Sequence, residues 1–96
     1  MNALTKLDTD IRTVIALLDL ILKHSDLTLE QRARFAQARA LAEVIKHEYH
    51  SMTLATIKER ASRILGLIPT TKEIVSTDKD RSLIVARIFS LRNLLR

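Results

Sequence analysis

Apolar residues in the first quarter of the chain recur at alternating steps of three and four. This spacing places them on one face of an α-helix, whereas on a β-strand it would scatter them over both faces. Further apolar residues between positions 15 and 22 widen the stripe, as in a helix that is covered on more than one side. The pattern predicts a bundle helix over residues 4–22, with a core stripe of Leu4, Leu7, Ile11, Val14, Leu18 and Ile21.

A second helix is predicted to begin after Thr28. Thr28 and Gln31 have the T-x-x-Q spacing of a capping box, in which each side chain accepts a hydrogen bond from the backbone N–H of the other residue. Beyond this start the same helical spacing returns, with a stripe of Phe35, Ala38, Ala42, Ile45, Tyr49 and Met52.

The helical phase changes near residues 50–53. In the phase of the second helix the stripe would continue onto Thr56 and Glu59, but the apolar residues resume at Leu54, Ile57, Ala61, Ile64 and Ile68. An unbroken helix over residues 28–65 would also be about 57 Å long, too long for a compact domain of this size. The sequence therefore predicts a turn here, with Ser51 or Thr53 as the N-cap of a third helix.

The third helix is predicted to end near Leu65. Gly66 offers a left-handed C-cap, and Pro69 cannot continue a helix. Thr70 and Glu73 have the spacing of a second capping box. Because few apolar residues follow, residues 70–80 fit either a short helical turn or an ordered loop.

A last helix is predicted from about Thr77 or Asp78 onward, with a core stripe of Ile84, Ile88, Leu91 and Leu95. Four such helices predict an all-α fold, an antiparallel up-and-down four-helix bundle that takes up residues 1–96 as one domain. Composition agrees with long helices, since 47% of the residues are hydrophobic and the chain has a single Gly and a single Pro.

Composition also excludes several kinds of functional site and targeting segment. The chain has no Cys, which excludes disulfides, a thiolate nucleophile and a cysteine-based zinc site, and which fits a reducing compartment. Asp8 and Asp10 precede the longest apolar stretch, unlike the residues of a secretory signal, and that stretch is far shorter than the roughly 20 residues that span a bilayer. We expect a soluble, cytoplasmic protein without a transmembrane segment.

The formal charge of +5 is concentrated in the second half of the chain. Residues 1–50 contain seven Lys or Arg and seven Asp or Glu, whereas residues 51–96 contain nine basic and four acidic residues. The segment Arg81–Arg96 has four Arg and no acidic residue. This asymmetry favours an acidic partner, an anionic membrane surface or nucleic acid near the C-terminal helix.

The C-terminal helix is the best candidate for an interaction surface. When its core stripe points inward, one flank holds Arg81, Arg92 and Arg96 with Val85 and Phe89, and the other holds Leu83, Arg87 and Leu94. Apolar groups interleaved with Arg are typical of protein interfaces and of membrane-facing helices. A wide stripe that packs between two helices, with solvated arginines, would explain the same pattern. The candidate partner-binding residues are Arg81, Arg87, Phe89, Arg92 and Arg96.

The sequence contains no pattern that predicts catalysis, a cofactor or a bound metal. There is no strand-turn-helix nucleophile motif and no Gly-rich phosphate loop. Glu43, His47 and His50 share one helical face, but the run H-E-Y-H is one residue shorter than the H-E-x-x-H of zinc peptidases. Solvated or capping histidines are therefore the preferred interpretation. Asp19 is interpreted as exposed, or as paired with a basic residue of a neighbouring helix.

Nucleic-acid binding is a second hypothesis. The GLIP segment, Gly66 to Pro69, could form the turn of a helix-turn-helix motif, but residues 70–80 are too acidic and too weakly apolar for a recognition helix. The aromatic residues that could stack on bases are few, and two of them have core spacing: Phe35, Phe89 and Tyr49.

The frame DLILKHSDLTLEQRARFAQARALAEVI, followed by LATIKERASRILGL, resembles the small cytosolic immunity proteins that lactic acid bacteria and streptococci make against class II bacteriocins, the enterocin A and pediocin type. Helix order, length, basic charge and lack of Cys agree over about residues 10–96. The resemblance implies a four-helix bundle without catalytic activity. It implies protection of a producing cell from the cytoplasmic side, at the membrane receptor complex of the pore-forming peptide, with much of the specificity in Arg81–Arg96.

We therefore expect a non-enzymatic protein that binds a protein partner, such as a membrane receptor complex, through its basic C-terminal helix. No cofactor and no metal are expected. Because the sequence stops within this helix, recognition through a flexible tail is not expected. A basic helical regulator of nucleic acid is the alternative, and both a monomer and a homodimer through the wide stripes of the first and last helices fit the pattern.

Overall fold

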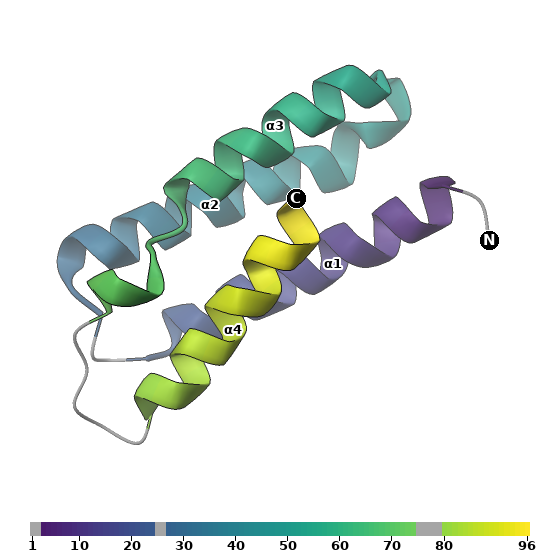
Figure 1. Ribbon diagram of the computed structural model, residues 1–96. Coiled ribbons are helices and arrows are strands. Elements are labelled where there is room, and N and C mark those ends of the chain that lie inside the picture. Colours follow the sequence, from purple (N-terminus) through teal and green to yellow (C-terminus); the bar gives the residue numbers. More distant parts are fainter. Residues whose placement is uncertain (1–2, 25–26, 75–79) are drawn as a thin grey trace.

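The computed structural model describes residues 3–24, 27–74 and 80–96, with all their side chains except those of residues 3–5, 80 and 81. Within these ranges it contains four α-helices and two 3₁₀ turns, and no β-strand. The helices are α1 (Ala3–Leu22), α2 (Leu29–Glu48), α3 (Leu54–Leu67) and α4 (Asp80–Leu95), and the turns are η1 (Tyr49–Ser51) and η2 (Thr71–Glu73). The predicted all-α fold is confirmed (Figure 1).

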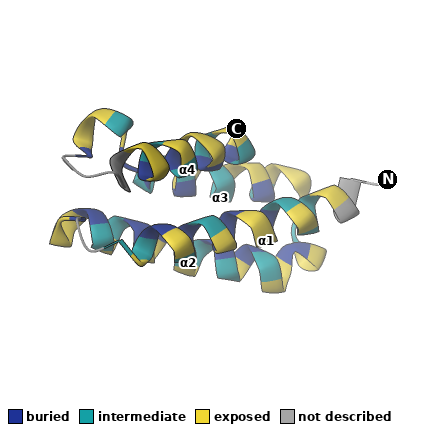
Figure 2. Ribbon diagram, turned by 90° about the horizontal axis from the view of Figure 1, so that it is seen from below, coloured by how far each residue is buried: buried dark blue, intermediate teal, exposed yellow. Residues whose placement is uncertain are grey.

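The four helices form a ring. Each helix packs against the next one along the chain, α4 returns to α1, and the pair α1–α2 has the most extensive contact. Successive helices run in opposite directions (Figure 1). Figure 2 shows α1 and α2 as one layer and α3 and α4 as the other, with buried residues between the layers. This arrangement is the helical bundle that the spacing predicts.

One hydrophobic core fills the space between the two layers. The predicted stripes meet in it, and Leu18, Phe35 and Ile88 are completely buried. Each large side chain of this kind stabilises the fold by about 1.5–3 kcal/mol relative to an exposed position. Leu7 and Met52, at the ends of their stripes, are half-buried against the core, and the side chain of Leu4 lies outside the described part.

Leu54, where the apolar residues resume after the change of phase, lies outside the core and is 65% exposed. Leu54 is the first residue of α3 and lies about one turn before Ile57. The last residue of α4, Leu95, lines the same cleft as Ile57. Because α4 ends at this level, it does not extend far enough to cover Leu54.

The predicted turn between the second and third helices is confirmed. η1 follows α2, and the Thr53 hydroxyl caps α3 by accepting a hydrogen bond from the Thr56 N–H at 3.2 Å. The longest dimension of the bundle is 42 Å. An unbroken helix over residues 28–65, at about 57 Å, would exceed it.

The third helix ends two residues later than predicted, and Gly66 is not a left-handed cap. No described residue has a positive φ, and α3 continues through Gly66 to Leu67. The next residue, Ile68, is extended, at φ −72° and ψ 119°. Ile68 precedes Pro69, whose ring disfavours the helical conformation for the residue before it. The proline, not the glycine, therefore ends this helix.

A short helical turn follows α3. η2 covers Thr71–Glu73, and the Thr70 N–H donates a hydrogen bond to the Glu73 carboxylate at 2.7 Å, as the second capping box predicts. Ile74 is buried in the core. The expected start of the last helix at Thr77 or Asp78 lies outside the described residues, in which α4 begins at Asp80.

The first turn of α2 also contacts the segment after α3. The predicted capping box is confirmed, since Thr28 and Gln31 exchange two hydrogen bonds of 3.1 Å between backbone N–H and side-chain oxygen. The Gln31 amide also donates to the Glu73 carbonyl at 2.6 Å. Gln31 is buried, and both ends of its side-chain amide are used.

Two arginines of α2 cap the C-terminal ends of the neighbouring helices. Arg32 donates to the carbonyls of Leu22 and His24, each at 2.5 Å, and Arg34 donates to the Leu67 carbonyl at 3.0 Å. These carbonyls lie at the ends of α1 and α3, where helical N–H donors run out and a cation is favoured by the helix dipole. Together with Gln31, these arginines bind backbone carbonyls at the end of α1, at the end of α3 and in η2. We refer to these three side chains of α2 as the polar clasp: Gln31, Arg32 and Arg34.

Candidate functional site

The candidate residues lie on α4, whose core stripe is buried against the other helices. Ile84, Ile88 and Leu91 are completely buried, and this burial orients every other position of α4. One side of the helix carries residues at steps of four, three and four, of which Phe89 is 64% exposed. Arg96 is exposed, and Val85 and Arg92 are half-buried. We refer to these four residues as the α4 strip: Val85, Phe89, Arg92 and Arg96.

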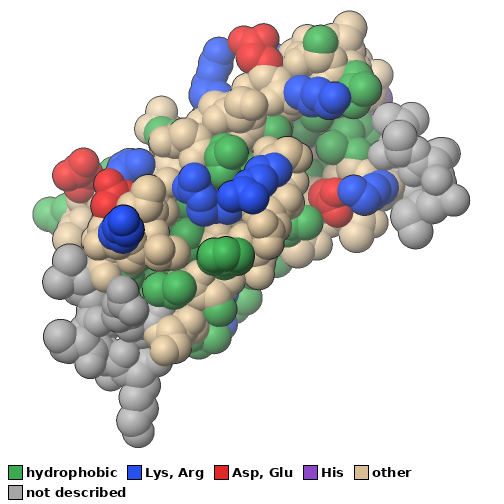
Figure 3. All heavy atoms as spheres, in the orientation of Figure 1, with side chains coloured by type: hydrophobic (Ala, Val, Ile, Leu, Met, Phe, Trp, Pro, Cys, Tyr) green, Lys and Arg blue, Asp and Glu red, His purple; other side chains and the backbone are tan. Residues whose placement is uncertain are grey.

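The α4 strip carries positive charge that its own helix does not neutralise. On the other helices, several cations pair with acids one turn away, as in Asp8–Arg12 at 3.0 Å and Glu59–Arg63 at 3.5 Å, whereas Lys46, Lys58 and Arg60 have no ion-pair partner among the described residues. Residues 82–96 contain no Asp or Glu. Among the described residues, neither Arg92 nor Arg96 has an ion-pair partner. Figure 3 shows cations and hydrophobic side chains at the centre of this face, with acidic side chains at its margins.

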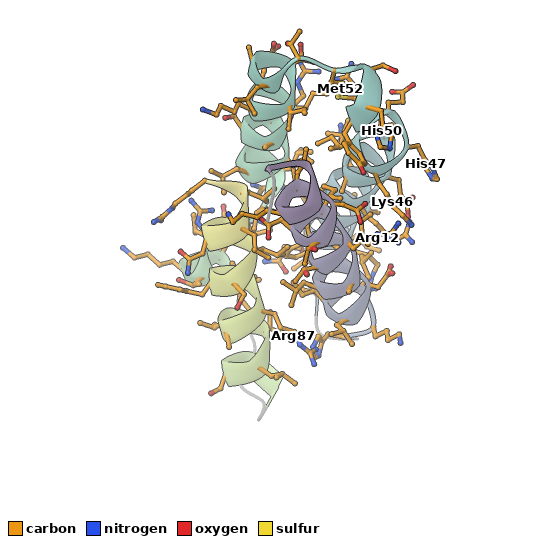
Figure 4. The ribbon with its side chains drawn as sticks, turned by 90° about the vertical axis from the view of Figure 1, so that its right-hand side faces the viewer. Arg12, Lys46, His47, His50, Met52 and Arg87 are labelled. Carbon is orange, nitrogen blue, oxygen red and sulfur yellow. The ribbon has the colours of Figure 1, made fainter. Side chains whose placement is uncertain are left out.

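Arg87 is separate from the α4 strip. It is half-buried, and its Nη1 lies 2.9 Å from Nε2 of His24. Because a guanidinium can only donate, His24 accepts this hydrogen bond through Nε2. Figure 4 shows Arg87 extending from α4 toward the C-terminal end of α1. The side chain therefore connects α4 to α1, which leaves the α4 strip on the opposite side of the helix, toward α3.

The first turn of α4 holds two further flank residues, Arg81 and Leu83. The side chain of Arg81 lies outside the described part, so its predicted role stays a prediction. Leu83, which the sequence places on the second flank but not among the candidate partner-binding residues, is 45% exposed. Leu94 has the same flank position in the sequence pattern but packs against the core. Spacing alone could not separate these two leucines, because their difference depends on where the neighbouring helices end.

The histidines of α2 and η1 have local partners. Nε2 of His47 lies 3.3 Å from the Glu43 carboxylate, which also contacts Arg39 at 3.4 Å. The His50 ring packs against the Tyr49 ring, with centroids 4.0 Å apart. Figure 4 shows His47 pointing outward from α2. Within the described part of the chain, no three His, Cys, Asp or Glu side chains are grouped as metal ligands.

Asp19 pairs across the α1–α2 contact, which is one of the two interpretations made from the sequence. Its Oδ1 lies 2.5 Å from Nε of Arg39. This hydrogen bond, together with the attraction between the charges, raises the pKa of Arg39, so the guanidinium stays charged throughout the physiological pH range. Because more than a third of each side chain is exposed, solvent screens the pair and its contribution to stability is small.

Comparisons with models of protein families, with curated proteins and with solved structures found no match to this chain. None of the helices, over the residues described, combines the length and the hydrophobicity that crossing a bilayer requires. The activity of the chain has to be inferred from the chemistry of its own surface.

Proposed function

We propose that the protein is a non-enzymatic immunity protein of the class II bacteriocin type, which acts in the cytoplasm on the peptide's membrane receptor complex through α4. The α4 strip is the observation that supports this proposal. It combines an exposed aromatic side chain, Phe89, with two arginines, Arg92 and Arg96, that have no acidic partner in the described residues. Aromatic residues and Arg are the types enriched at protein interfaces and their hot spots.

The cleft at the end of the bundle also favours a binding role over catalysis. Its lining is apolar except for Asp10, and the Asp10 carboxylate pairs with Lys6 at 3.5 Å. An enzyme site needs several polar groups that converge on a substrate. A single carboxylate that already has a partner does not supply them.

Expression of the chain in a bacteriocin-sensitive strain tests the proposal. We expect protection against at least one of a panel of class II peptides, and loss of that protection in the Phe89→Ala, Arg92→Glu double variant. Leu29→Ala is the matched control, because Leu29 is 87% exposed and lies at the start of α2, away from the α4 strip. Failure of the unaltered chain against every peptide of the panel would remove the immunity function.

Nucleic-acid binding is the alternative, since Arg92 and Arg96 could also contact phosphates. Retention on DNA or RNA that falls as salt rises would support it. Absence of retention at about 50 mM salt, where phosphate contacts are strong, would dismiss it. Light scattering on the same samples distinguishes a monomer from a homodimer.

A further inference from the structure

We infer that the α4 strip recognises an acidic amphipathic helix of a partner protein. Phe89 would pack against apolar residues of that helix, and Arg92 and Arg96 would bind its carboxylates. The inference rests on the proposed function, because it uses the same surface, and it adds the charge and the shape of the partner.

The charge of the α4 strip favours an anionic partner. The described cations of α1, Lys6 and Arg12, each pair with an Asp one turn away. The sequence of α4 offers no such acid at positions 82–96. Arg binds carboxylates through paired, charge-assisted hydrogen bonds, which gives such a contact orientation as well as attraction.

The apolar part of the α4 strip favours a partner that presents an apolar surface in addition to negative charge. Phe89 is 64% exposed, and Val85, one turn before it, is half-buried beside it. An aromatic ring gains most when a partner removes it from water. A partner that presents only carboxylates would leave this ring exposed, so we expect an apolar residue opposite Phe89.

The spacing of the α4 strip fits a helix better than a flat surface. Phe89, Arg92 and Arg96 follow one another over two turns of α4, a length of about 10 Å. Directly opposite the core stripe, α4 instead presents small or polar exposed residues, Ala86 and Asn93. A bilayer that lay against this side of α4 would face small and polar residues, which offer it no apolar anchor. A helix that lies beside α4, on its α3 side, can contact all three residues, because its own side chains also recur at intervals of one helical turn.

A synthetic amphipathic helix provides the probe. The peptide has about 20 residues, with Leu along one face and Glu on both sides of that face, and a matched peptide has Gln in place of each Glu. Fluorescence anisotropy at about 0.15 M salt measures binding under conditions that screen weak surface attraction. We expect the acidic peptide to bind, and the Gln peptide to bind at least about tenfold more weakly.

Two exposed positions of the α4 strip allow variants that preserve the fold. Phe89→Ala and Arg96→Glu should each weaken the acidic peptide's binding at least about fivefold. Lys72→Glu in η2 makes the same change in charge at an exposed site outside the α4 strip, and Leu29→Ala removes an exposed apolar side chain from α2. Both controls should bind as the unaltered chain does. Circular dichroism verifies that all four variants are folded.

Four results would overturn the inference. Equal binding of the Glu and Gln peptides would do so, and so would equal losses in the strip variants and the controls. Strip-dependent binding to phosphatidylglycerol vesicles without binding to the acidic peptide would identify a lipid surface instead. Protection of a sensitive strain without binding of the acidic peptide would overturn this inference but keep the proposed function. Binding of the peptide that depends on the α4 strip, without protection of a sensitive strain, would keep this inference and remove the proposed function.

Discussion

The two ends of the bundle are held together in different ways. At one end, the polar clasp of α2 binds the backbone at the ends of α1 and α3 and in η2. At the other end, where α4 stops, side chains from all four helices line a cleft, among them Leu7, Ile57 and Leu94. We refer to this second end as the open end. Directional hydrogen bonds specify the chain path at the clasp, whereas the open end depends on non-directional apolar contact.

The two kinds of contact differ in the free energy that is lost when a side chain is removed. A helix-end carbonyl that loses its donor in a partly buried site keeps the cost of desolvation without a compensating bond. An apolar side chain at the margin of a cleft loses only part of its burial when it is shortened. We therefore expect single substitutions at the clasp to be more harmful than comparable ones at the open end.

The largest effect is expected for Arg32→Ala. This change removes the donor for two helix-end carbonyls, those of Leu22 and His24, and should lower the free energy of unfolding by about 3 kcal/mol. Urea denaturation followed by circular dichroism measures it. Arg63→Ala is the control, because Arg63 makes an exposed ion pair with Glu59, and its loss should cost less than about 1 kcal/mol. Similar losses in both variants would contradict the role of the clasp.

Gln31→Ala should have the next largest effect. It removes the hydrogen bond that the Gln31 side chain accepts from the Thr28 N–H and the one that it donates to the Glu73 carbonyl, with an expected loss of about 2 kcal/mol. Gln31→Glu separates the two contributions. An ionised Glu can still accept from the Thr28 N–H but cannot donate to the Glu73 carbonyl. If this variant were as stable in urea as the unaltered chain, the contact between α2 and η2 would contribute nothing to the free energy of unfolding.

At the open end, Leu94→Ala should lower the free energy of unfolding by only about 1 kcal/mol, because Leu94 is half-buried and already borders the cleft. Thermal denaturation is the measurement. Combined with Arg32→Ala, the two losses should add to within about 0.5 kcal/mol, because the sites are far apart. A loss at Leu94 as large as that at Arg32 would remove the contrast between the two ends.

The smallest effect is expected for Gly66→Ala, and it should be stabilising. Gly66 is helical, its φ is not positive, and an added Cβ would meet no atom within 4 Å. Ala has the higher helix propensity, so the melting temperature should rise by an amount that corresponds to about 0.5–1 kcal/mol. A fall would show that Gly66 adopts the left-handed conformation after all.

The sequence predicted the elements wherever short-range signals agree. The spacing of three and four identified all four helices, and the Thr28–Gln31 pair marked the start of α2. At the end of α3, Gly66 and Pro69 signal a stop within four residues of each other, and only the structure shows that Pro69 decides it. Leu54 has the right phase for the core, but its exposure depends on how far α4 extends.

Apart from the capping box, the bonds of the polar clasp could not be predicted, because they join residues 8 to 42 positions apart in the sequence. Arg34 contacts Leu67, and nothing near either residue announces the contact. The same limit applies to the candidate site. Periodicity placed Phe89, Arg92 and Arg96 on one side of α4, but it could not show that Arg87 is bonded to His24, which lies 63 positions away. Whether the α4 strip binds a partner stays a prediction.

The clasp also has a consequence for the order of folding events. The hydrogen bond between Gln31 and Glu73 joins residues 42 positions apart, so α2 and α3 must fold back on each other before this bond can form. We expect a contact of such long sequence separation to form after the transition state, in which case its loss accelerates unfolding and hardly changes the refolding rate. In stopped-flow experiments, Gln31→Ala should therefore shift the unfolding arm of the chevron and leave the refolding arm in place. The clasp would then slow the unfolding of a bundle that has already assembled, without speeding its assembly.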